Sequence, residues 1–181
     1  RQRLANADPD NVDWQRGLAV SYDRIGDVLM AQDNMGDALK AFEDQFAIAE
    51  RLARIDPGNV GWQRDLSVSY EKVGDVQMAQ GNLPEALKSY RAGLAIRERL
   101  ARNDPDNVGW QRSLSVSYDC IGDVLEAQSE VDEALKAFRA GLEIRKRLAQ
   151  RDPDNVGWQR DLSVSYDRIG EVLEAQGNLD E

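Results

Sequence analysis

One stretch of this sequence occurs twice almost unchanged, as DPDNVGWQRSLSVSYDCIGDVLEAQ at residues 104–128 and as DPDNVGWQRDLSVSYDRIGEVLEAQ at residues 152–176. The copies differ at three positions: Ser113/Asp161, Cys120/Arg168 and Asp123/Glu171. More divergent copies precede them, because the tryptophans recur every 48 residues: Trp14, Trp62, Trp110 and Trp158. A fixed period of this length indicates a repeat protein in which one helical unit stacks on the next.

The period divides the chain into a little under four units. We expect them at approximately residues 8–55, 56–103, 104–151 and, incomplete, 152–181, with residues 1–7 ending a preceding helix. Because the chain begins at Arg1 and stops at Glu181 within the pattern, we expect a fragment of a longer protein. The first unit is the most divergent, since Gln45 stands where later units have Gly93 and Gly141.

Each unit contains two helical stretches separated by turn residues. In the second unit the first stretch runs from about residue 60 to residue 80, and Gly81 suits a left-handed helix end. Asn82 then caps the second stretch, and Pro84 fits its first turn. Pro105 ends that stretch near residue 103, because the residue before a proline avoids helical geometry. We therefore predict an all-α fold of stacked antiparallel helix pairs, with about seven long helices and an N-terminal stub.

Composition argues against several classes of function. With 0 His and 1 Cys, the usual proton shuttle and the commonest metal ligand are absent and no internal disulfide can form. Lys+Arg 23 against Asp+Glu 33 gives a net charge of −10, which would repel phosphate backbones and anionic lipid. We therefore expect a cytoplasmic protein that is not an enzyme, with no cofactor, no metal, no nucleic acid and no membrane partner.

The repeated residues resemble the tetratricopeptide repeat. Its motif positions are matched by Tyr70, Val73-Gly74 and Gly81 in the first stretch and by Ala86, Tyr90 and Gly93 in the second. The resemblance implies a right-handed α-solenoid, a superhelix of stacked helix pairs. The period here is 48 rather than 34. Each helix gains about two turns, similar to long-helix repeats of the kinesin-light-chain type.

Pairs of carboxylates recur four residues apart, at Asp23/Asp27, Glu71/Asp75, Asp119/Asp123 and Asp167/Glu171. General acid–base catalysis, a solvated face and ligand binding are the three interpretations, and repetition argues against catalysis. The resemblance implies that this side of the first helix lines a concave groove that grips peptides. The candidate partner-binding residues are then Asp23, Asp27, Glu71, Asp75, Asp119, Asp123, Glu126, Asp167, Glu171 and Glu174.

The four tryptophans admit two interpretations. They are either platforms on which a bound peptide stacks or an additional core layer produced by the longer helices. Their identical placement next to Leu and Val favours the core layer.

The functional prediction is a protein- or peptide-binding scaffold whose acidic groove takes a basic segment of a partner protein. The alternative is a structural module that self-assembles without a specific groove ligand. Helices at the two ends of the array would expose apolar faces, so homo-oligomers could form through these ends.

Overall fold

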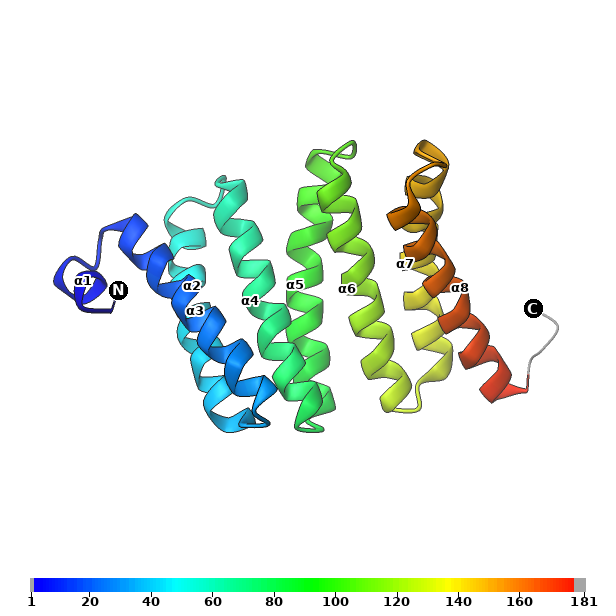
Figure 1. Cartoon of the computed structure of the whole chain (residues 1–181), viewed down its shortest axis with the longest axis horizontal. Coiled ribbons are helices and arrows are strands. Elements are labelled where there is room, and N and C mark those ends of the chain that lie inside the picture. The colour runs from blue at the N-terminus through cyan, green and yellow to red at the C-terminus, as the bar shows by residue number, and fades with distance from the viewer. Residues whose placement is uncertain (1, 178–181) are drawn as a thin grey trace. The chain divides into compact units, whose positions relative to one another are not determined.

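The computed structural model describes residues 2–177, and over this range all regular structure is helical. The helices are α1 (Gln2–Ala7), α2 (Val12–Ala31), α3 (Met35–Ile55), α4 (Val60–Ala79), α5 (Leu83–Asn103), α6 (Val108–Ala127), α7 (Val131–Arg151) and α8 (Val156–Gln176) (Figure 1). The predicted all-α repeat, with seven long helices and an N-terminal stub, is confirmed. Within the described range, no helix is both long and apolar enough to cross a membrane.

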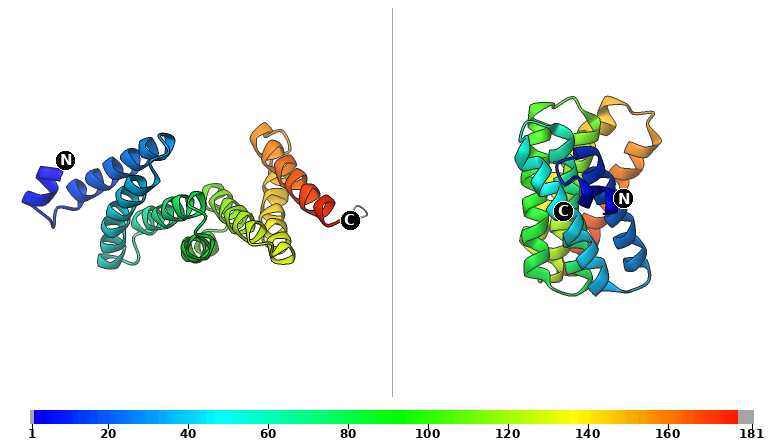
Figure 2. Two further views of the ribbon diagram at one scale, coloured as in Figure 1. Left: turned by 90° about the horizontal axis from the view of Figure 1, so that it is seen from below. Right: turned by 90° about the vertical axis from the view of Figure 1, so that its left-hand side faces the viewer.

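The chain folds into two compact units, each larger than one 48-residue repeat. The first unit is Arg1–Ile96 and the second unit is Arg97–Glu181. In the first unit α3 packs against both α2 and α4, and α1 contacts α2. In the second unit α7 packs in the same way against α6 and α8. Figure 1 shows that α2, α3 and α4 run in alternating directions, and Figure 2 shows these helices from two further sides. Within each unit, these long helices therefore pack against their sequence neighbours.

Asparagine side chains begin the first helix of every repeat. In each case the Asn Oδ1 accepts a hydrogen bond of 3.1 Å from the backbone N–H of the Trp three residues later: Asn11 to Trp14, Asn59 to Trp62, Asn107 to Trp110 and Asn155 to Trp158. Such a cap satisfies one of the N–H groups that the first helical turn leaves unpaired. The Asp-Pro segment and its Asn therefore fix the helix start and place each Trp in the first turn.

The tight turn that follows each first helix contains one residue in the left-handed region. These residues are Asp33 (φ 59°), Gly81 (φ 74°), Ser129 (φ 63°) and Gly177 (φ 76°). The predicted left-handed helix end at Gly81 is confirmed. Asp33 and Ser129 adopt the same backbone with a Cβ, which costs about 1–2 kcal/mol relative to glycine.

A glycine in the middle of the first helix lets an aromatic ring lie directly on the backbone. A Cβ on Gly74 of α4 would lie 2.7 Å from the Tyr90 ring of α5, and one on Gly26 of α2 would lie 2.5 Å from Phe42 of α3. Phe42 is fully buried and packs with Val76, so each ring joins consecutive helices. The aliphatic-Gly and aromatic positions of the repeat are thus two halves of one contact.

Candidate partner-binding site

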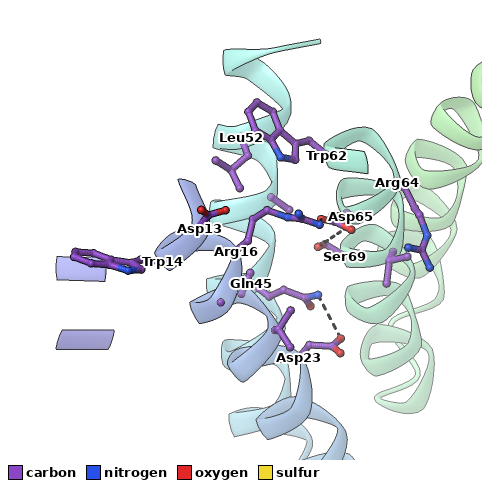
Figure 3. Close-up of a pocket in the computed structure, with 15 residues that line it drawn as sticks. Asp13, Trp14, Arg16, Asp23, Gln45, Leu52, Trp62, Arg64, Asp65 and Ser69 are labelled. Atoms are coloured by element: carbon purple, nitrogen blue, oxygen red, sulfur yellow. Dashed lines mark hydrogen bonds and ion pairs between the residues drawn. The ribbon is translucent and has the colours of Figure 1, made fainter. Parts of the chain in front are cut away.

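A cleft of about 740 Å³ opens in the first unit between α2, α3 and α4 (Figure 3). Its lining comprises Asp13, Trp14, Arg16, Gly17, Ala19, Val20 and Asp23 of α2, Gln45, Ala49 and Leu52 of α3, and Trp62, Arg64, Asp65, Val68 and Ser69 of α4. The cleft therefore combines two indoles, several aliphatic side chains and charges of both signs.

The interpretation of the tryptophans as an additional core layer is wrong. Trp14 is 37% exposed, the other three are half-buried, and none of the four belongs to the buried core. Trp14 and Trp62 instead line the cleft. The N-cap explains this placement, because it fixes each Trp in the first helical turn, near the end of the helix rather than at the centre of the stack.

An ion pair closes part of one side of the cleft. Arg16 Nη2 of α2 lies 3.1 Å from Asp65 Oδ2 of α4, and both side chains are more than a third exposed. The second unit repeats this pair 96 residues later, where Arg112 of α6 lies 3.0 Å from Asp161 of α8. Exposed pairs of this kind contribute little stability, about 0–1 kcal/mol. Their recurrence indicates that they align successive first helices.

Asp23 contributes a carboxylate to the cleft, with Gln45 as its hydrogen-bonding neighbour. Gln45 Nε2 donates to Asp23 Oδ1 over 3.3 Å. Burial raises the pKa of the Asp23 carboxyl above its ordinary value, although the charge of Lys72 opposes the shift. Gln45 is only 8% exposed, and its Oε1 has no hydrogen-bond partner. The cleft therefore contains an underpaired carboxylate beside a buried amide oxygen.

Intramolecular partners occupy several other carboxylates of the predicted stripe. Lys72 Nζ lies 2.6 Å from Asp27, and Arg168 Nη1 lies 2.6 Å from Asp123. Arg145 binds Asp119 through both of its terminal nitrogens, and the Tyr90 hydroxyl donates to Asp75 over 2.7 Å. Burial also raises the pKa of Asp123, against the opposing charge of Arg168. Cationic partners thus neutralise three of these carboxylates, Asp27, Asp119 and Asp123.

The remaining predicted residues are not part of the cleft lining. Glu126, Asp167, Glu171 and Glu174 are exposed, and Glu71 is half-buried. Of the ten candidates, Asp23 is the one that lines the cleft. The sequence reasoning missed Gln45, Val20 and Val68 as lining residues, although the replacement of glycine by Gln45 marked the first repeat as different. In the described part of the chain, no three His, Cys, Asp or Glu side chains are grouped to hold a metal ion.

Comparison with known proteins places residues 114–154 in the tetratricopeptide repeat family. Three solved structures share the fold. MamA is 17% identical with a TM-score of 0.55, over 99% of this chain and 76% of that one. A Podosopora anserina protein described as a kinesin light chain with nearly identical TPR-like repeats is 21% identical with a TM-score of 0.60, over 90% and 71%. BtubC (BKLC) from P. vanneervenii is 18% identical with a TM-score of 0.54, over 98% and 79%.

No curated protein matches the sequence. At these identities the solved structures establish the fold alone. The matched family segment contains the whole of α7 and most of α6, and the other repeats carry the same motif at the same spacing. Residues 114–154 therefore match the tetratricopeptide repeat family, and the chain shares its fold with solved structures that include a Podosopora anserina protein with TPR-like repeats.

Proposed function

We propose that this chain is a non-enzymatic scaffold that binds a basic segment of a partner protein in the cleft between α2, α3 and α4. Tetratricopeptide-repeat folds generally mediate protein–protein interaction. The observation that carries the proposal is the cleft itself, about 740 Å³ in volume, with indole and aliphatic walls and the carboxylate of Asp23. A concave, largely apolar site with a few placed polar groups is the usual form of a binding site.

Charge supports a basic ligand. The whole chain carries −10, which favours encounter with cations and accelerates their association at low salt. Within the cleft, Arg16 and Asp65 neutralise each other, so that the remaining charges of the lining are Asp13 and Asp23 against Arg64. The local balance is therefore negative, as it is for the chain.

Binding to a panel of extended peptides tests this proposal. We expect the chain to select peptides that combine Lys or Arg with apolar residues, and we expect their affinity to fall as salt is raised. Asp23→Lys should weaken binding, whereas Asp167→Lys, the same charge change on an exposed position of α8, should have a much smaller effect. Selection of acidic peptides, or equal effects of the two substitutions, would contradict the proposal.

Self-association is the second candidate function, because α2 exposes an apolar face. Ile25 and Val28 are 49% and 56% exposed. The equivalent of Val28 in the next repeat, Val76, is fully buried against Ala38 and Phe42 of α3. A second copy of the chain could cover the α2 face in the same way. Sedimentation velocity at several protein concentrations tests this candidate: a monomer throughout would refute it, and a dimer dissociated by Val28→Asp would support it.

A further inference from the structure

Two later repeats carry a buried arginine at the position where the first repeat has Ala49. Arg97 and Arg145 follow Ala49 by 48 and 96 residues and are 6% and 7% exposed. A buried arginine needs acceptors for its charge, since an unpaired buried charge is strongly unfavourable. The contacts of these two arginines therefore show which groups surround this position of the repeat.

Arg145 of α7 bridges the helices on either side of it. Its Nη1 lies 3.2 Å from Asp119 Oδ1 of α6, and its Nη2 donates to the other oxygen of the same carboxylate. Nη1 also donates to Ser165 Oγ of α8 over 2.6 Å. Arg97 repeats the last contact, because its Nη1 donates to Ser117 Oγ over 2.7 Å. The Arg145 guanidinium thus lies between an acidic side chain and a hydroxyl, and Arg97 shares the hydroxyl contact.

In the first unit the three equivalent positions are Asp23, Ala49 and Ser69, and all three line the cleft. The acceptors of the guanidinium are kept, but the arginine is missing. Figure 3 shows the carboxylate of Asp23 facing the amide of Gln45, which supplies one neutral donor instead of two charged ones.

A second substitution accompanies the loss of the arginine. Gly141 corresponds to Gln45, and a Cβ on Gly141 would lie 3.2 Å from Asp119 Oδ1, tighter than an ordinary contact. A glycine at position 141 therefore leaves room for the Asp119 carboxylate that binds Arg145. The first repeat has Gln45 and Ala49 in place of that glycine and arginine, and the cleft lies at this site.

We infer that the cleft receives an arginine side chain from the partner segment, with its guanidinium on the carboxylate of Asp23, as Arg145 lies on Asp119. This inference rests on the proposed function and specifies its ligand. Gln45 Oε1, which is buried and has no partner, offers a further acceptor beside the carboxylate. Val20, Val68 and Leu52 of the lining provide apolar surface for the aliphatic stem.

Arginine fits this site better than lysine. Its planar guanidinium can donate to both oxygens of one carboxylate, as Arg145 does, and it is more weakly hydrated than an ammonium group. Burial also disfavours the charged form of Asp23, so that a matching cation relieves an existing cost.

Fluorescence anisotropy with two labelled peptides tests the inference. Both are extended Leu-X-Leu peptides, with X either arginine or its neutral isostere citrulline. We expect the wild-type chain to bind the arginine peptide at least tenfold more tightly. The double substitution Ala49→Arg/Gln45→Gly gives the first repeat its own arginine and should weaken binding at least tenfold. Ala47→Arg adds the same charge at an exposed position of α3 and should change the affinity less than threefold.

Asp23→Asn provides a second variant of nearly unchanged shape should the double variant fail to fold, and it too should lose at least tenfold. Equal binding of the two peptides by the wild-type chain would overturn the inference, and so would an unchanged affinity of Asp23→Asn. If basic peptides still bind in those cases, the proposed function survives and its site is elsewhere. If no basic peptide binds, the proposed function fails as well.

Discussion

Replacing Arg145 by alanine tests how much its guanidinium stabilises the packing of α7 against α6 and α8. The side chains of Arg145 and Asp119 are 9% and 16% exposed, so solvent screens their interaction weakly. The substitution would leave a carboxylate that has lost both charged donors and would also remove the donor to Ser165. Breaking a buried ion pair from one side costs about 3–5 kcal/mol. We expect Arg145→Ala to destabilise the chain by this amount.

The combined variant Arg145→Ala/Gly141→Gln reproduces the arrangement of the first repeat. The new amide can donate to Asp119 as Gln45 donates to Asp23, and we expect it to recover about 1 kcal/mol of the loss. Urea unfolding followed by circular dichroism, with Trp fluorescence as a second probe, gives the three midpoints. A cost below about 1 kcal/mol for Arg145→Ala, or a further loss on adding Gly141→Gln, would refute the reasoning.

Three further predictions concern stability. Gly74→Ala should destabilise the fold by about 1–3 kcal/mol, because its Cβ would meet the Tyr90 ring. Gly170→Ala, at the equivalent position of α8 with open space around it, should stabilise the fold by about 0.5–1 kcal/mol. Equal effects of the two substitutions in thermal melts would contradict the contact between the ring and the glycine backbone. Ser129→Gly should raise stability by about 1 kcal/mol by relieving a left-handed backbone, and an unchanged melting temperature would show that the turn is not strained. Burial and a hydrogen bond to Glu98 raise the pKa of Tyr118 to about 12. The fold therefore favours the neutral phenol, so its stabilisation is complete below the ordinary pKa of about 10 and is lost as the pH rises toward 12. Tyr118→Phe should flatten the pH dependence of the unfolding midpoint in that window, and an unchanged profile would exclude this contribution.

The fold was predictable because its signals are local and repeated. The left-handed residue at Gly81 and the helix-ending Pro105 act within a few residues of themselves, and four copies of one pattern reduce the chance of misreading it. The LSVSY segment at residues 66–70 alternates like a strand but forms part of α4. Its buried serines return their hydroxyls to the helix backbone, as Ser69 does to the carbonyl of Asp65, so polar positions fit inside the stack.

The site was less predictable because it depends on which charges meet across helices. The sequence shows Asp27 and Lys72, but their ion pair joins residues 45 positions apart, and only the packing of α2 beside α4 brings them together. Which carboxylates of the acidic stripe are already paired within the chain therefore cannot be read from the sequence. Gln45 was visible as a departure from the repeat, yet its meaning depends on Ala49, which lies one helical turn further along α3.

The central claim is that a basic segment binds in the cleft of the first unit, and the tryptophan indole N–H signals in ¹H–¹⁵N NMR test it most directly. The four tryptophans occupy equivalent positions in four repeats, so each reports on its own repeat. On addition of the arginine peptide, we predict that the signals of Trp14 and Trp62, which line the cleft, shift together and saturate. The signals of Trp110 and Trp158 should stay in place. Shifts confined to Trp110 and Trp158, or no shift at peptide concentrations that saturate anisotropy, would contradict the account.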